Sequence, residues 1–79
     1  MHDRADSWGA AVRNRRRQLG LRQDQVAALA GISVRSVHAV ESSKPSVRLD
    51  VVLAVTEALG LELTLDGPST RTTVRPAPR

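Results

Sequence analysis

The protein has 79 residues, a net charge of +4 and no cysteine, and its length fits one domain with flanking segments. The missing cysteines exclude disulfides and thiolate metal sites, which fits a reducing cytoplasm. His2 and His38 are too few and too far apart to indicate a metal site, and no cofactor is indicated. No apolar run approaches the roughly 20 residues of a membrane span, and the first residues lack the apolar stretch of a signal peptide. We therefore expect no membrane association.

The charges are unevenly distributed along the chain. Residues 7–48 carry eight basic side chains against two acidic ones, whereas residues 49–66 carry four acidic side chains and no basic one. A basic region beside an acidic end indicates a polyanionic partner on one side of the protein. Charge alone would leave a solvated, arginine-rich surface as the simpler interpretation.

The first predicted helix spans about residues 8–19. Residues 1–6 are polar and are expected to be flexible, and Ser7 is a suitable N-cap. Gly20 stands where a glycine commonly ends a helix. The predicted inner face of this helix comprises Trp8, Val12, the stem of Arg16 and Leu19.

Two short helices are predicted next, over residues 23–30 and from residue 34 to about residue 42. Gly31 ends the first and Ser33 caps the second, so only a tight turn separates them. The side chains expected in the core from these two helices are Val26, Ala27, Ala30, Val37 and Val40.

A loop is predicted over residues 43–46, because Pro45 lacks a backbone donor and disfavours helix at Lys44. A fourth helix is predicted over residues 49–59, and Gly60 follows it. Its candidates for burial are Leu49, Val52, Leu53, Val55, Thr56 and Leu59.

Residues 61–65 alternate between apolar and polar side chains, which is typical of a β-strand. A lone strand leaves backbone groups unpaired, and no second strand is evident in the sequence. We therefore predict that this strand pairs with the same strand of a second copy, with Leu61, Leu63 and Leu65 as dimerisation residues. The alternative is a short extended tail lying on its own domain. Residues 66–79 are rich in proline and threonine and are predicted to be a disordered tail.

The stretch QDQVAALAGISVRSVHAVESSKPS resembles the helix-turn-helix of the phage-repressor family, the Cro/CI or XRE type. Ala27 is small enough for two helices to cross closely, and Gly31 tolerates the left-handed conformation of the turn. The resemblance implies an all-α fold of five segments, with four to five helices, over residues 7–60, followed by the strand at 61–65. The matching positions are Gln23, Ala27, Gly31, Ile32, Ser33, Val37, Glu41 and the Lys44–Pro45 loop.

A narrower resemblance lies at the end of the fourth predicted helix. The sequence ALGLELTL is similar to that of HipB-type antitoxins, in which a C-terminal strand pairs with its dyad mate. This resemblance implies a homodimer and a HipA-like toxin as a partner.

Two positions depart from the family pattern. Arg22 and Arg48 stand where small capping residues are usual, and good caps are worth about 1 kcal/mol. Each arginine places a guanidinium near a helix N-terminus, where phosphates also bind. Arg22 is therefore a candidate phosphate contact, and for Arg48 a solvated surface arginine is an equal alternative.

The third helix carries the candidates for reading bases. Arg35 lies in its first turn, on the face away from Val37, and arginine can bond guanine O6 and N7 together. The alternative role for Arg35 is a phosphate contact, and for His38 it is an exposed helix residue. The candidate base-reading residues are Val34, Arg35, His38 and Ala39. The candidate phosphate contacts are Arg22, Gln23, Ser33, Ser36, Ser43 and Lys44. The family resemblance implies this role for Gln23, and Ser33 is primarily a helix cap.

The resemblance also implies that Arg16 and Glu41 form an inward ion pair between the first and third helices. Either charge would be costly to bury alone, so we interpret the pair as structural.

Together these features predict a cytoplasmic, nucleoid-associated homodimer that represses transcription at a palindromic operator in double-stranded DNA. We expect an antitoxin that represses its own operon and neutralises a HipA-like kinase. Nothing in the sequence resembles a catalytic site, so an enzyme is not expected. The alternatives are a stand-alone phage-type or metabolic repressor and, from another class, a protein-interaction module.

Overall fold

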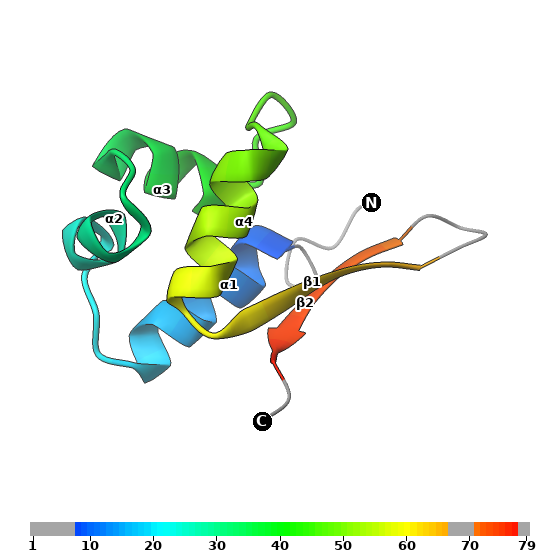
Figure 1. Cartoon of the computed structure of the whole chain (residues 1–79), viewed down its shortest axis with the longest axis horizontal. Helices are drawn as coiled ribbons and strands as arrows, with labels where there is room; N and C mark the ends of the chain where they lie inside the picture. The colour runs from blue at the N-terminus through cyan, green and yellow to red at the C-terminus, as the bar shows by residue number, and fades with distance from the viewer. Residues whose placement is uncertain (1–7, 67–70, 78–79) are drawn as a thin grey trace.

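The computed structural model describes residues 8–66 and 71–77. Four helices are followed by an antiparallel two-stranded sheet, and Figure 1 shows this hairpin extending away from the helices. The elements are α1 (Trp8–Gln18), α2 (Gln23–Ala30), α3 (Val34–Glu41), α4 (Leu49–Ala58), β1 (Leu61–Asp66) and β2 (Arg71–Pro76). This architecture confirms the mainly helical fold and places every predicted helix within a residue or so of its expected bounds. The predicted flexible residues 1–6 and the cap Ser7 lie outside the described residues.

The turn between α2 and α3 has the geometry that its sequence predicts. Gly31 has φ of 72°, in the left-handed region, and the Ile32 N–H donates to the Ala27 carbonyl at 3.0 Å. The Ser33 side chain then accepts the Ser36 N–H at the start of α3. Only a residue without a β-carbon adopts this turn freely, so Gly31 permits the tight turn between α2 and α3.

The core lies among all four helices and the first residue of β1. Its buried apolar side chains are Val12, Val26, Ala27, Val37, Val40, Val52, Val55, Leu59 and Leu61. Among the described residues, no helix is long and apolar enough to cross a membrane.

Three leucines expected in the core are exposed instead. Leu19 is 46% exposed, because it follows the last residue of α1 where the chain turns toward Gly20. Leu49 and Leu53 are 63% and 43% exposed, on the flank of α4 beside the face that Val52 and Val55 bury.

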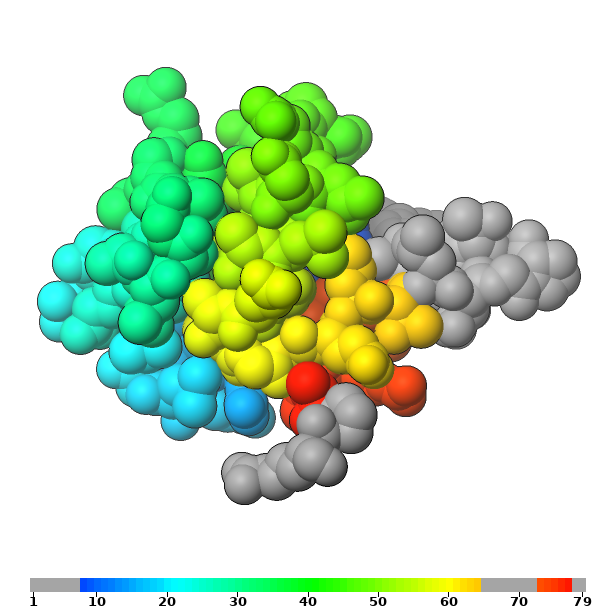
Figure 2. All heavy atoms as spheres, in the orientation of Figure 1, coloured from blue at the N-terminus to red at the C-terminus, as the bar shows by residue number. Residues whose placement is uncertain are grey.

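The C-terminal sheet corrects the sequence interpretation. Residues 71–76 form β2 and pair with β1 in the same chain, from Leu61↔Pro76 to Asp66↔Arg71. The prediction that no second strand exists was therefore wrong, as was the prediction of disorder for residues 71–76. Residues 67–70 and 78–79 lie outside the described residues. Figure 2 shows β1, in orange, lying against the yellow end of α4, which it contacts.

The start of α1 is packed tightly against the end of α3. The Gly9 N–H donates to Ser43 Oγ at 3.0 Å, and Gly9 is buried. A β-carbon on Gly9 would overlap Ser43 Oγ and would lie 2.5 Å from the Glu41 carbonyl oxygen and 2.7 Å from that of Val40. Position 9 therefore admits no side chain without a shift of α1 away from α3.

We expect Gly9→Ala to destabilise the fold by about 1–3 kcal/mol, although alanine is the better helix former, because the methyl group overpacks this contact. Chemical denaturation measures the change. Adding Ser43→Ala should not restore stability, since the two backbone oxygens remain. A Gly9→Ala variant as stable as the wild type would contradict the close approach of α1 and α3.

Candidate nucleic-acid interface

The outer face of α3 is free of packing while its inner face is anchored. Val37 and Val40 are fully buried, whereas Arg35 and His38 on the opposite side are exposed. Val34 is 44% exposed at the first position of the helix. Figure 2 shows the green segment around the start of α3 standing out from the surface. The predicted base-reading residues thus lie on an accessible helix face, with Ala39 half-buried at its edge.

The two serines at the start of α3 bond to each other. Ser33 Oγ accepts the Ser36 backbone N–H at 3.1 Å and lies 2.9 Å from Ser36 Oγ. Ser33 therefore acts as the N-cap that its position predicts. Each serine was also a candidate for a phosphate contact, and the outer lone pairs of both hydroxyls remain compatible with one.

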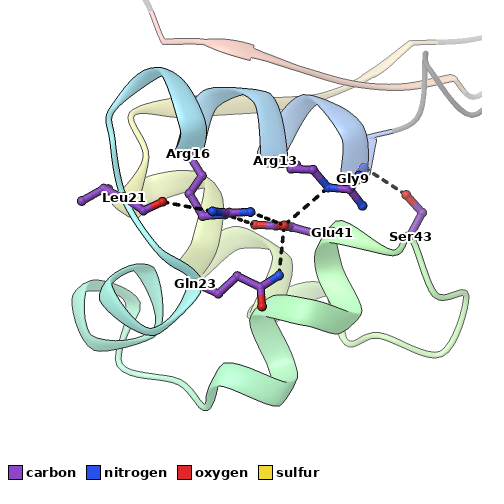
Figure 3. A network of polar contacts seen from close by, with 7 residues as sticks. All are labelled: Gly9, Arg13, Arg16, Leu21, Gln23, Glu41 and Ser43. Atoms are coloured by element: carbon purple, nitrogen blue, oxygen red, sulfur yellow. Dashed lines mark hydrogen bonds and ion pairs between the residues drawn. The ribbon is translucent and has the colours of Figure 1, made fainter.

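The polar centre of the domain is the carboxylate of Glu41, the last residue of α3, shown in Figure 3. Arg16 of α1 donates to both carboxylate oxygens, from Nε at 2.6 Å and from the terminal nitrogen at 3.0 Å. Gln23 Nε2 donates to Oε1 at 3.1 Å, and Arg13 Nε lies 3.7 Å from the same oxygen. Arg16 also donates to the Leu21 carbonyl at 3.0 Å. The structure thus contains the ion pair implied by the family resemblance and extends it to α2.

This environment determines the protonation of Glu41. Burial alone would raise the pKa of Glu41, since the side chain is only 2% exposed. Hydrogen bonds from Arg16 and Gln23, with the positive charges of Arg16 and Arg13, outweigh that effect and hold the pKa below its ordinary value. The same hydrogen bond raises the pKa of Arg16. Both groups therefore carry their charges at neutral pH.

At the start of α2, the residues predicted to contact phosphate form hydrogen bonds within the chain. The Gln23 amide, a predicted phosphate contact, donates to Glu41 within the chain. Arg22 Nε donates to Asp24 Oδ1 at 3.0 Å, and Arg22 makes no capping bond with its side chain, since a guanidinium has no acceptor. Gln25 supplies the remaining half of a capping box, because its Oε1 accepts the Arg22 N–H at 2.8 Å.

The loop after α3 is anchored by its backbone and by one side chain. Ser43 has φ of 53°, and its hydroxyl is occupied by the Gly9 N–H. The Lys44 N–H donates to the Ala39 carbonyl at 3.2 Å, while Lys44 itself is exposed. Of the two predicted phosphate contacts in this loop, the structure leaves Lys44 directed to solvent and commits Ser43 Oγ to α1.

The dimerisation residues lie in β1. Leu61 is buried, and Leu63 is half-buried and packs against the core of its own chain. The side chain of Leu65 lies outside the described residues. The leucine side chains of β1 that are described therefore find cover within one protomer.

One contact that the sequence did not predict joins α1 to the end of α4. Arg15 Nε donates to the Leu59 carbonyl at 2.9 Å, which satisfies an otherwise open helix end. No sequence pattern distinguishes Arg15 from its neighbours Arg13 and Arg17, so this contact emerges only from the packing.

Comparisons with known proteins identify the class. Residues 8–65 match the family described as "Helix-turn-helix domain". The chain is also 36% identical over 63 residues to a protein described as "Uncharacterized HTH-type transcriptional regulator y4mF" from Sinorhizobium fredii (strain NBRC 101917 / NGR234). The aligned stretch covers 80% of this chain and 83% of that protein. The chain belongs to the helix-turn-helix family, which presents the second helix of the motif, here α3, to DNA. The predicted class is therefore confirmed.

Glu41→Ala is expected to destabilise the fold by about 3–5 kcal/mol, because it leaves the guanidinium of Arg16 without its carboxylate in a nearly dry site. Urea unfolding monitored by circular dichroism measures the loss. Asn14→Ala, on the exposed side of α1, serves as a control that should change stability little. A loss for Glu41→Ala no larger than the control's would contradict the role of the buried pair.

The lowered pKa of Glu41 also predicts an acid dependence. Its stabilising contribution is fully present above the unfolded-state pKa and is lost as the pH falls through the lower, folded-state pKa. Glu41→Gln removes this titration, so stability should depend less steeply on pH in the acidic range. Denaturation midpoints at a series of acidic pH values give the two curves. Parallel curves for the variant and the wild type would show that Glu41 does not titrate with folding.

Proposed function

We propose that the protein is a homodimeric, sequence-specific transcriptional repressor that binds a palindromic operator through α3. The observation that carries this proposal is the exposed face of α3. Arg35 and His38 lie on this face, while the buried Val37 and Val40 anchor the opposite face in the core. A helix in this setting fits the major groove, where arginine can pair with guanine. The relative from Sinorhizobium fredii is described as a transcriptional regulator, which agrees with this role. Repression follows from occupancy of the operator.

The dimer contact proposed here is the outer edge of β1. The Ala77 N–H donates to the Gly60 carbonyl at 2.9 Å, and this pair continues the register of the sheet. Bonded and non-bonded pairs alternate in an antiparallel ladder, so Leu61 and Leu63 belong to non-bonded pairs with Pro76 and Val74. Their own N–H and C=O groups therefore point away from β2.

Among the described residues, the sheet has two strands, so no third strand covers that edge of β1. The opposite edge, on β2, carries Pro76 at an outward position and lacks a donor there. Edge pairing through β1 around a two-fold axis would join two hairpins into a four-stranded sheet. To meet two half-sites, such a dimer would need to place its two α3 helices about 34 Å apart, which is one turn of DNA.

The finer role that we propose is that of an antitoxin that represses its own operon and neutralises a HipA-like kinase. The likeness of residues 58–65 to the end of HipB-type antitoxins supports it. The test is co-expression with the product of the adjacent gene, followed by co-purification and binding of the complex to the upstream DNA. A kinase-like neighbour that co-purifies and loses its toxicity would support the antitoxin. A chain that binds its upstream DNA with no such neighbour would be a stand-alone repressor.

A protein-interaction module is the alternative from another class. The exposed cations of α3 and the following loop, Arg35 and Lys44, favour a polyanion over a protein surface. Binding to generic duplex DNA that weakens with salt distinguishes the two, because displacement of counterions is the mark of phosphate contacts.

Arg35→Ala is expected to weaken operator binding by about 1–3 kcal/mol and to relax the preference at one base position in each half-site. Lys44→Ala is the matched control, since it should weaken all sequences alike and make the salt dependence shallower by about one unit. Fluorescence anisotropy with operator variants separates the two patterns. Equal loss on every sequence for Arg35→Ala would make Arg35 a phosphate contact.

Leu63→Pro is expected to shift the protein toward the monomer and to reduce operator affinity, because proline removes an N–H from the outer edge of β1. Leu63→Ala removes the same leucine side chain but keeps that N–H. Its dimer fraction should therefore be larger than that of Leu63→Pro. Sedimentation equilibrium compares the two, and circular dichroism verifies that both are folded. Equal dimerisation of the folded variants would contradict the β1 edge as the contact.

A further inference from the structure

Two helices of this chain begin with the same arrangement of charges. Arg22 is the N-cap of α2 and pairs with Asp24, at 3.0 Å from Nε and 3.5 Å from the terminal nitrogen. Arg48 is the N-cap of α4 and pairs with Asp50 at 3.0 Å. In both places an arginine and an aspartate two residues later replace the usual capping side chain, and all four side chains are largely exposed.

The cations near the candidate interface therefore divide into two groups. Arg22 and Arg48 each have an aspartate partner, whereas Arg35 and Lys44 form no ion pair among the described residues. The pairing of Arg22 is not the result of many acidic residues nearby in the sequence. Residues 7–48 contain only two acidic residues, Asp24 and Glu41, and Glu41 is buried. Asp24 is thus the one exposed acid in the basic part of the chain.

The Arg22–Asp24 pair lies beside the end of α3. Gln23, between the two residues, donates to Glu41 at the last position of α3, and the loop with Lys44 follows directly. In a helix-turn-helix bound to DNA the first helix of the motif, here α2, crosses the backbone, so a phosphate would pass near α2. There the Asp24 carboxylate competes with a phosphate for the guanidinium of Arg22 and repels the phosphate itself.

We propose that Asp24 restrains Arg22 and thereby lowers the affinity of the protein for DNA of any sequence, and that Asp50 restrains Arg48 in the same way. The inference rests on the proposed binding of DNA. Asp24 acts through Arg22 and is a positioning residue, not a DNA contact. Because the restraint acts on phosphate contacts, it weakens operator and generic DNA alike and leaves base reading to the unpaired Arg35.

Asp24→Asn tests the first pair, with Glu57→Gln as the matched control. Both substitutions remove one exposed negative charge, but Glu57 lies near the far end of α4 and has no partner among the salt bridges of the described residues. The probe is a short duplex of arbitrary sequence, titrated at several salt concentrations. We expect Asp24→Asn to bind about three- to fivefold more tightly, with a salt dependence steeper by up to about one unit. Glu57→Gln should change both quantities much less.

A second background shows whether the gain passes through Arg22. In an Arg22→Ala protein, Asp24→Asn should improve binding much less than it does in the wild type, because only the direct repulsion of the phosphate is then removed. An equal gain with and without Arg22 would overturn the restraint and leave only long-range repulsion. Asp50→Asn, with Arg48→Ala as its background, tests the second pair by the same comparison, and an unchanged affinity and slope would remove that pair.

The outcome separates this inference from the proposed function. A wild-type protein that fails to bind any duplex would refute DNA binding itself. A wild type that binds, together with an Asp24→Asn variant of unchanged affinity and slope, would refute only the restraint. Thermal melting of each variant verifies that the exposed substitutions leave the domain folded.

Discussion

One buried carboxylate holds the helix-turn-helix together. Glu41 lies at the end of α3 and receives hydrogen bonds from Arg16 of α1 and from Gln23 of α2. A buried charge is tolerated only where its partners are in place, so the three helices must adopt one mutual arrangement for the chain to fold at all. The valine core supplies the free energy of burial, but valines permit small sliding movements that a two-pronged arginine–carboxylate contact does not. The direction of α3, and hence of its exposed face, follows from this contact.

This arrangement divides the polar side chains by task. Some polar side chains form hydrogen bonds that join one element to another and so stabilise the fold. These bonds join Gln23 to Glu41, Ser43 to Gly9 and Arg15 to Leu59. Three exposed side chains on the outer surface of α3 and the following loop, Arg35, His38 and Lys44, form no side-chain hydrogen bond or ion pair among the described residues. A rigid frame with free outer side chains suits recognition of DNA, because little order has to be gained when the complex forms.

Local patterns account for what the sequence predicted, and long-range contacts for what it missed. Helix bounds follow from caps and glycines within a few residues, so all four helices were predicted nearly to the residue. The bonds of Gln23 and Ser43 join residues 18 and 34 positions apart, and no local pattern indicates them. The strand β2 was missed because its threonines and Pro76 are typical of a disordered tail, and only the pairing with β1 shows that Pro76 occupies a position where no inward donor is required.

The position of Pro76 also bears on how the hairpin can assemble. A two-stranded sheet has two free edges, and a sheet open at both could add further copies without limit. Here the edge of β2 lacks a backbone donor at Pro76, whereas on β1 both Leu61 and Leu63 have an outward N–H and an outward C=O. If two copies join through β1, each uses the edge whose outward donors at Leu61 and Leu63 are intact and leaves outside the edge that Pro76 interrupts. In that arrangement the second strand, by placing Pro76 on the outer edge, would favour a closed dimer over an open chain of copies.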